Sequence, residues 1–450
     1  MNAEPTSRAD RVIARCREIA RCTEVEGQTT RTFLADSMHR VHALLSEWMR
    51  AAGMQVRIDV AGNLRGALPA TSRGAPRLLI GSHLDTVANA GAFDGVLGVV
   101  LGVALVEEIA ADARNTTTAG KGMPFDLEVI GFSEEEGVRF AKPFLGSLAL
   151  LGELDAATLA RTDATGISVA EAIRDFGLDP AELPAAALDP STFAYLEFHI
   201  EQGPVLESEG IALAAVDAIA GQTRMAFTFT GHANHAGTTP MGPLRHDALA
   251  AAAAWIVEVE RYAAATPGLV ATVGKLEVPS AAGNVVPGAS IATLDVRHAH
   301  DSVRAAAVQH LVDFARTAAA ARGVALAHTT SLDQSAVPMD PALAALVAES
   351  VGRTTGRSAR ILTSGAGHDA MILARRVPSA MLFLRTPGGL SHHPDESVLS
   401  ADVEAALAAG LEFLARLRDD RAMLDQLVTH AKTLRSRAHA EAPTQKAGHA

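Results

Sequence analysis

The chain has 450 residues, of which 48% are hydrophobic, enough for two or three domains with packed cores. Its formal net charge is −12 and no basic run occurs, so we expect no nucleic-acid partner. The two cysteines exclude a disulfide framework and a C-x-x-C metal site. The N-terminal segment has no apolar stretch, and the longest apolar runs fall short of the ~18 residues that span a bilayer. We therefore expect a soluble, cytoplasmic protein without a membrane contact.

The first half of the chain alternates between helix and strand patterns. The periodicity predicts helix over residues 8–53, which include both cysteines, and again over 95–111. Strands are predicted at 54–60, 77–80, 125–132 and 195–200. A strand, a helix and a strand at this spacing form a βαβ unit, so we expect an α/β fold with a mainly parallel sheet.

Residues 218–330 follow a different order. The predicted elements are strands at 224–230, 269–277, 290–297 and 325–330, and helices at 246–263 and 301–322. The order βαββαβ is typical of the ferredoxin-like fold. We therefore predict an inserted domain at 218–330 within a main domain formed by residues 1–217 and 331–450. Residues 420–450 predict a helix followed by a loose tail.

The first distinctive motif follows the predicted strand at 77–80. His83 and Asp85 are two positions apart, which places both side chains on one face of an extended chain. Imidazole is a common ligand of zinc-like ions, and a nearby carboxylate often orients it. Alone, the pair is weak evidence, because a single histidine is more often a packed core residue.

Two acidic features each have a structural and a functional interpretation. Asp94 precedes the predicted helix at 95–111, where an aspartate is also a favourable N-cap. Glu134, Glu135 and Glu136 follow a predicted strand. A solvated turn explains three adjacent carboxylates, whereas a metal site would compensate their repulsion. Adjacent glutamates could also divide the work, one binding a metal and the other moving protons.

Histidines recur where predicted strands and turns end. They are His199, His232, His235, His298, His368, His392 and His393. Open α/β sheets place their sites at the carboxyl ends of strands. The joint recurrence of His, Asp and Glu at such ends predicts a metal-dependent hydrolase.

The sequence resembles the M20 metallopeptidase superfamily, in its amidohydrolase branch, from about residue 10 to about residue 415. The branch includes allantoate amidohydrolases, N-carbamoyl-L-amino-acid hydrolases and β-ureidopropionases. The motifs that carry the resemblance stand in the family's order: GSHLDTV, FDG, EEEGVRF, FHIEQGP, NHAGTTPM, GNVVPG, DVRH, SGAGHDA and SHHP. The resemblance implies a parallel-sheet catalytic domain, here 1–217 and 331–450, and an inserted lid at 218–330 that also dimerises.

The resemblance implies a set of metal ligands. His83 and His199 resemble the ligands of one ion, and Asp94 resembles the carboxylate that bridges two ions. Glu136 and His392 resemble the ligands of the second ion. We therefore expect two divalent ions per subunit, Zn or Mn, with Co or Ni as alternatives. The family usually shows SHNP, and His393 stands here in place of the asparagine.

The resemblance also implies how the substrate is handled. Glu135 resembles the general base, and Asp85 the residue that orients His83. His235 resembles a histidine that polarises the scissile carbonyl from the partner subunit of a homodimer. Asn284 and Arg297 resemble the clamp for a substrate carboxylate, and the further correspondences are Gln202, Arg224 and Gly365.

The implied activity is hydrolysis of a ureido bond in a small carboxylate substrate. Allantoate, which would yield ammonia, carbon dioxide and ureidoglycine, is the first expectation, and N-carbamoyl-L-amino acids or N-carbamoyl-β-amino acids are the alternatives. His199 stands where the peptidases of the superfamily use a carboxylate, which argues against an aminopeptidase or dipeptidase. A non-catalytic binding protein is the alternative from another class, and the intact Glu135 argues against it.

Overall fold

The computed structural model describes residues 7–114, 122–279 and 281–441. The chain forms two compact units. Unit 1 comprises Met1–Asp217, Met339–Leu362 and His368–Ala450, and unit 2 comprises Ala218–Pro338 and Thr363–Gly367. In the described part of the chain, no helix combines the length and the apolar character needed to cross a membrane.

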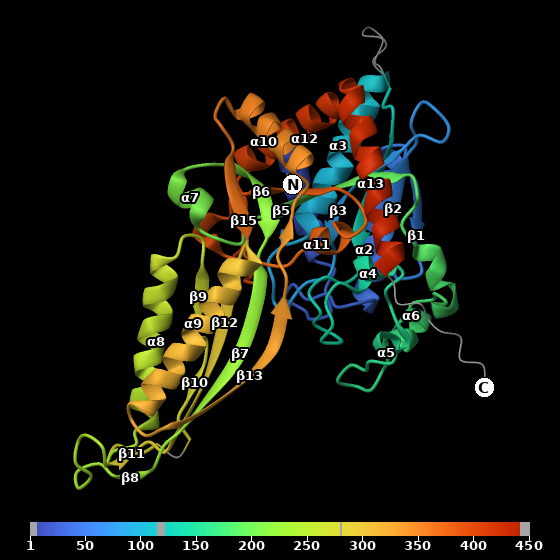
Figure 1. Ribbon diagram of the computed structural model, residues 1–450. Coiled ribbons are helices and arrows are strands. Elements are labelled where there is room, and N and C mark those ends of the chain that lie inside the picture. The colour runs from blue at the N-terminus through green and yellow to red at the C-terminus, as the bar shows by residue number, and fades with distance from the viewer. Residues whose placement is uncertain (1–6, 115–121, 280, 442–450) are drawn as a thin grey trace. The chain divides into compact units, whose positions relative to one another are not determined.

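Unit 1 is built on a sheet whose strands run in the order β1-β2-β4-β3-β5-β16-β6 (Figure 1). The bounds are β1 Gln55–Ile58, β2 Leu64–Leu68, β3 Arg77–His83, β4 Asp126–Phe132, β5 Thr192–Ile200, β6 Leu213–Ile219 and β16 Ser379–Leu384. β14 (Val337–Pro338) and β15 (Arg360–Ser364) also pair with β6. The four central strands β4, β3, β5 and β16 are parallel, whereas β1, β2 and β6 are joined antiparallel. The expected α/β fold with a mainly parallel central sheet is confirmed.

Helices cover the central strands of unit 1. All nine residues of β5 are buried, so both faces of the sheet are covered there, as parallel sheets require. One layer consists of α3, α10 and α12, which pack on the central strands, and of α1, which packs on α3 and α12. The helices of unit 1 are α1 Arg8–Ala20, α2 Asp36–Ala51, α3 Val96–Arg114, α4 Leu145–Leu150, α5 Ala156–Leu159, α6 Val169–Asp175, η1 Pro180–Ala186, α7 Val205–Glu209, α10 Pro341–Thr355, α11 Asp369–Leu373, η2 Pro387–Gly389, α12 Ser400–Asp419 and α13 Arg421–Glu441.

The prediction of helix throughout residues 8–53 is wrong between α1 and α2, and Cys22 lies outside α1. The cause is Arg31, whose side chain is buried and donates hydrogen bonds to the backbone carbonyls of Leu84, Ile19 and Cys22. Its own backbone carbonyl accepts from the N–H of Thr86 at 2.8 Å. The bonds with Leu84 and Thr86, which lie more than 50 positions away, hold this segment out of a helical conformation. At the other end of the chain, α13 is the helix expected after residue 420, and the expected tail at 442–450 lies outside the described residues.

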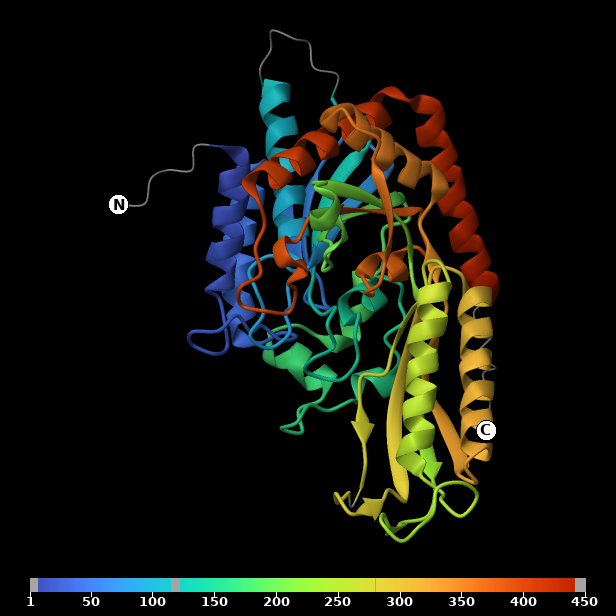
Figure 2. The ribbon, with the colours of Figure 1, turned by 90° about the vertical axis from the view of Figure 1, so that its left-hand side faces the viewer.

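Unit 2 is a sheet with two helices on one face, α8 and α9 lying side by side (Figures 1 and 2). The main strands run in the order β10-β12-β7-β13, with β9 also on β12, and the described pairs are antiparallel. This is the ferredoxin-like topology. The elements are β7 Gly221–Thr230, β8 Asn234–His235, α8 Ala248–Ala265, β9 Val270–Thr272, β10 Leu276–Glu277, β11 Val285–Val286, β12 Ala289–His298, α9 Asp301–Ala320 and β13 Ala325–Gln334.

The core of unit 2 lies between its sheet and its helices. β7 and β12 bury every second side chain, which is the pattern of a sheet with one covered face. Phe227 and Phe229 of β7 pack against Trp255 of α8 and Leu311 of α9. The opposite face of these strands therefore carries the polar residues of β7 and β12, including Arg224 and Arg297.

Candidate metal centre

The candidate ligands of unit 1 gather where parallel strands end. His83 is the last residue of β3, Glu135 follows β4, and His199 lies next to the end of β5. His83 is directly opposite Phe132, the last residue of β4, in the strand register. The carboxyl ends of neighbouring parallel strands share one edge of the sheet, which brings these side chains together.

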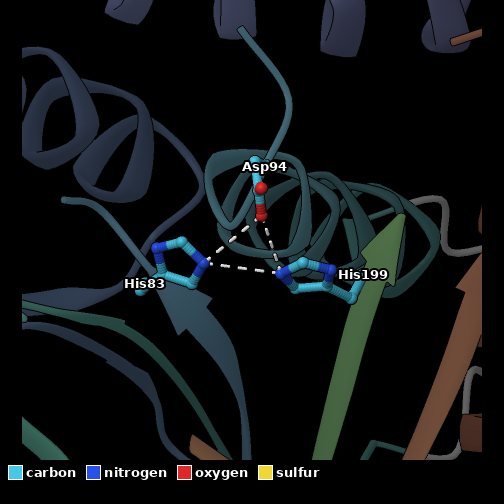
Figure 3. A group of neighbouring side chains, drawn as sticks. All are labelled: His83, Asp94 and His199. Atoms are coloured by element: carbon cyan, nitrogen blue, oxygen red, sulfur yellow. Dashed lines mark hydrogen bonds and ion pairs between the residues drawn. The ribbon is translucent and has the colours of Figure 1, made fainter. Parts of the chain in front are cut away.

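His83, Asp94 and His199 form one group of potential ligands, and all three are buried (Figure 3). Asp94 Oδ1 lies 3.2 Å from His199 Nε2 and 3.6 Å from His83 Nε2. Gly95 makes this approach possible, because its φ is +67° and an added Cβ would lie 2.4 Å from His83 Cε1. The FDG motif therefore places a carboxylate directly against the two imidazoles.

The backbone sets the orientation of both imidazole rings. His83 Nδ1 lies 3.0 Å from the carbonyl oxygen of Asp85, and His199 Nδ1 lies 2.9 Å from that of Ile200. A carbonyl only accepts, so Nδ1 carries the hydrogen in both rings. Nε2 is then the atom that takes up a proton or a metal ion. This second-partner arrangement is the usual one for histidine metal ligands.

A second group shares Asp94 with the first. His392 Nε2 lies 3.4 Å from Asp94 Oδ2 and 3.3 Å from Glu136 Oε1. Asp94 thus lies between the two groups, with one oxygen facing each. His393 belongs to neither group of potential ligands. Its Nδ1 accepts a hydrogen bond from the backbone N–H of Asp395 at 3.1 Å.

The cluster favours positive charge. Burial opposes ionisation of Asp94, but the facing imidazoles, led by His199, hold its pKa well below the usual range. Hydrogen bonds to Asp94 and Glu136 raise the pKa of His392 to about 10. Asp94 Oδ1 is buried and accepts no hydrogen bond of good geometry. The donor set of imidazole and carboxylate therefore fits divalent cations such as zinc or manganese.

Asp85 braces the glutamates rather than only a histidine. Its Oδ1 accepts from the backbone N–H of Glu135 at 2.9 Å, and its Oδ2 accepts from that of Glu136 at 3.0 Å. Its contact with His83 is made mainly through its backbone carbonyl. Burial raises the pKa of Glu135 well above its usual value, and the charge of Glu136 adds to the increase while His83 opposes it. Both glutamates belong to the same group of potential ligands as His83.

Gln202 and Ser391 both donate hydrogen bonds to Oδ2 of Asp94. Gln202 Nε2 donates to Asp94 Oδ2 at 2.9 Å and lies 3.1 Å from Ser391 Oγ. Ser391 Oγ donates to the same carboxylate oxygen at 2.7 Å. Gln202 reaches this position with a φ of +57°, uncommon for a residue other than glycine. Gln202, expected near the substrate, thus contacts a candidate metal ligand.

In unit 2, the two predicted arginines meet at Asp295. The Arg297 guanidinium pairs with both oxygens of Asp295 at 2.8 and 2.9 Å, and its third nitrogen donates to Gly365 O at 2.6 Å. Arg224 Nε pairs with Asp295 Oδ2 at 3.0 Å. Asp295 thus fixes the direction of the Arg297 fork, leaving the remaining N–H groups for a ligand.

His235 and Asn284 lie at the tip of unit 2 formed by β8 and β11. Their backbones are linked, because Ala236 N–H donates to Asn284 O at 2.9 Å. His235 Nδ1 accepts from the backbone N–H of Gly237 at 3.1 Å. The hydrogen of its neutral ring is therefore on Nε2, opposite to His83 and His199. His235 is exposed and presents a donor rather than a lone pair.

Ser391, Asp295 and His368 have no individual role predicted from the sequence. Each stands inside one of the motifs SHHP, DVRH and SGAGHDA, and this position is the sequence signal that could have indicated a role. His368 is buried with its ring centroid 4.4 Å from that of His199, and burial holds its pKa well below the usual value. Only the folded chain shows that it packs behind a candidate ligand.

Fold and site together define a class: a two-unit α/β protein with a His, Asp and Glu cluster at the carboxyl edge of its sheet, as in metal-dependent hydrolases. A family model described as Peptidase family M20/M25/M40 matches residues 79–419. The chain belongs to this family.

Two curated relatives and a solved structure extend the comparison. Allantoate deiminase of Arabidopsis thaliana is 36% identical, over 90% of this chain and 82% of its own. N-carbamoyl-L-amino acid amidohydrolase of Geobacillus stearothermophilus is 40% identical, over 82% of this chain and 88% of its own. The crystal structure of an amidase of the hydantoinase/carbamoylase family from Burkholderia multivorans superposes with a TM-score of 0.83 at 30% identity, covering 91% of this chain and 98% of that one.

Proposed function

We propose that this protein is a two-metal hydrolase that cleaves a ureido C–N bond in a small substrate bearing a carboxylate. The observation that carries the proposal is the orientation of His83 and His199, whose Nε2 atoms both face the carboxylate of Asp94. The names of the Arabidopsis and Geobacillus relatives support the choice of a ureido bond.

Five side chains would hold the two ions. His83 and His199 would hold one, Glu136 and His392 the other, and Asp94 would bridge them. Two divalent cations there, zinc or manganese with cobalt or nickel as alternatives, would polarise a water molecule and the substrate carbonyl. Asp85, through its hydrogen bonds to two backbone N–H groups, keeps Glu136 at the cluster.

Glu135 is proposed as the general base. It accepts a proton from the attacking water and passes it to the leaving nitrogen as the C–N bond breaks. A buried carboxylate with a raised pKa is suited to both steps, because it takes a proton from water more readily than an ordinary carboxylate does and still gives it up to the more basic departing amine. With allantoate, the released groups are ammonia and, after loss of carbon dioxide from the carbamate, ureidoglycine.

Unit 2 is proposed to act as the lid and dimerisation domain. The Nε2–H of His235 suits donation to a developing oxyanion, and the free edge of Arg297, with Asn284, suits a substrate carboxylate. Arg224, Gln202 and Gly365 complete the proposed substrate contacts. We propose a homodimer in which the partner subunit's His235 completes each site, and a cytoplasmic location, in keeping with two buried free cysteines.

Allantoate is the first proposed substrate, because the Arabidopsis relative matches 90% of this chain against 82% for the Geobacillus relative. An N-carbamoyl-L-amino acid is the second, because the Geobacillus relative has the higher identity, 40% against 36%. The test is ammonia release by the manganese- or zinc-loaded protein from allantoate and from a panel of N-carbamoyl-L-amino and N-carbamoyl-β-amino acids. The highest kcat/KM identifies the substrate. Hydrolysis of dipeptides in preference to every ureido compound, or no turnover at all, would refute the proposed function.

A further inference from the structure

Glu396 lies in the chain segment that follows His392, and its side chain is buried. Its Oε1 accepts hydrogen bonds from two consecutive backbone N–H groups, those of Phe93 at 2.8 Å and Asp94 at 2.9 Å. Its own N–H donates to the carbonyl oxygen of His393 at 3.0 Å. One side chain thus connects the segment of His392 to the segment of Asp94, about 300 positions apart in the chain.

Gly91 leaves the space that Glu396 occupies. A Cβ added at Gly91 would lie 2.3 Å from Glu396 Cβ and 2.5 Å from Glu396 Oε1. Real Cβ atoms do not approach so closely, so any larger residue at 91 must displace the glutamate. The glycine and the glutamate are therefore two parts of one contact.

The two connected segments hold ligands of the same proposed ions. His392 has a φ of +56° and its imidazole is 48% exposed, so little packing fixes it. Its distance of 3.4 Å to Asp94 Oδ2 depends on where the backbone of each segment lies. A metal site binds its ion more weakly when the hydrogen bonds and contacts that orient its ligands are removed.

We propose that Glu396 is a positioning residue that holds the His392 segment against the Asp94 segment. It thereby keeps the ligands of both ions at the distances from one another that metal binding needs. The inference rests on the proposed two-metal function. The positioning depends on one oxygen of Glu396, which accepts hydrogen bonds from two backbone N–H groups. The amide oxygen of glutamine can accept the same two bonds, whereas alanine cannot.

Binding of Co²⁺ tests this without any substrate. The chelator-stripped full chain is titrated with Co²⁺, and the visible absorption of the bound ion is recorded. We expect two ions in the wild type and about 10- to 100-fold weaker binding in Glu396→Ala, the usual effect of removing an outer partner of a ligand. Gly91→Ala should weaken binding in the same direction. Glu396→Gln should stay within about threefold of the wild type, because it restores the acceptor.

A matched control separates positioning from general stability. Asp340 Oδ1 also accepts from two consecutive backbone N–H groups, those of Ala342 and Leu343, each at 3.0 Å, but contacts no candidate ligand. Asp340→Ala should lower the melting temperature and leave Co²⁺ affinity unchanged.

The outcomes are distinguishable. Fewer than two Co²⁺ ions in the wild type would refute the proposed function and this inference together. Two ions in the wild type with unchanged affinity in Glu396→Ala would refute the inference alone, as would a Glu396→Gln variant as weak as alanine. If Glu396→Ala does not fold, unchanged affinity in Gly91→Ala refutes it instead.

Discussion

The Nε2 atoms of His83 and His199 lie 3.4 Å apart and face one another. Each ring is held in this orientation by a backbone carbonyl on its Nδ1. Two neutral imidazoles so placed direct their lone pairs at one point, next to a buried carboxylate oxygen. This arrangement is unfavourable unless protons or a metal ion occupy that point, so a bound metal ion should stabilise the folded state.

Metal removal should therefore lower both activity and stability. Metal analysis of the loaded protein should find close to two divalent ions per chain. Adding a divalent ion at 100 times its Kd should stabilise the stripped fold by about 2.7 kcal/mol, measured as a rise in melting temperature. A fully active protein that contains no metal after strong chelation would contradict the prediction.

Glu135→Gln should separate chemistry from metal binding. We expect it to keep both ions and the melting temperature but to lose at least about 100-fold in kcat, because the attacking water has no base. Glu136→Ala, its neighbour, should instead lose metal. Near-normal turnover by Glu135→Gln would show that the roles of the two glutamates are assigned wrongly.

Asp85→Asn should damage the site through the backbone. An asparagine has one acceptor oxygen, so one of the N–H groups of Glu135 and Glu136 would face an amide nitrogen. A buried N–H without a partner costs about 1–3 kcal/mol, and metal affinity should also fall. Asp126→Asn is a suitable comparison, because Asp126 Oδ1 accepts from the N–H of Ala70 at 2.8 Å at the other end of β4. Equal metal affinity in the two variants would exclude the proposed bracing.

Arg297→Ala should raise KM more than it lowers kcat. A charge-assisted hydrogen bond to a substrate carboxylate contributes about 1.5–3 kcal/mol, which corresponds to roughly 10- to 150-fold in KM. Arg224→Ala should have a smaller effect on KM, because Arg224 is fixed by one contact with Asp295, through Nε, whereas Arg297 is fixed by two. The measurement is steady-state kinetics with the best substrate of the panel, and a KM unchanged in Arg297→Ala would remove this residue from the clamp.

Subunit complementation tests the proposed shared site. Inactive Glu135→Gln chains and inactive His235→Ala chains are mixed under conditions that exchange subunits. A mixed dimer should regain one working site, in which one subunit supplies Glu135 and the partner supplies His235. If mixed dimers form but remain inactive, His235 acts within its own chain or not at all.

Several features followed from the sequence because they are local. Runs of apolar residues predicted β3, β4, β5 and α3, and the strand ends indicated where His83 and His199 lie. The order of elements in unit 2 predicted a ferredoxin-like topology, which the strand order confirms. Burial periodicity depends on neighbours within a few positions, so sequence alone is sufficient for it.

Tertiary structure alone decided how the candidate groups are held. Helix periodicity ran through residues 8–53, yet Arg31, between α1 and α2, donates to the carbonyl oxygen of Leu84, 53 positions away, and this segment is not helical. Other contacts at the candidate site were likewise not predictable from the sequence. They are the hydrogen bonds of Asp85 to two backbone N–H groups, of Asp295 to two arginines, and of Glu396 to the backbone of Asp94. Hydrogen bonds between distant segments leave no periodic signal in the sequence, because their geometry exists only after the strands have set the distances between the segments.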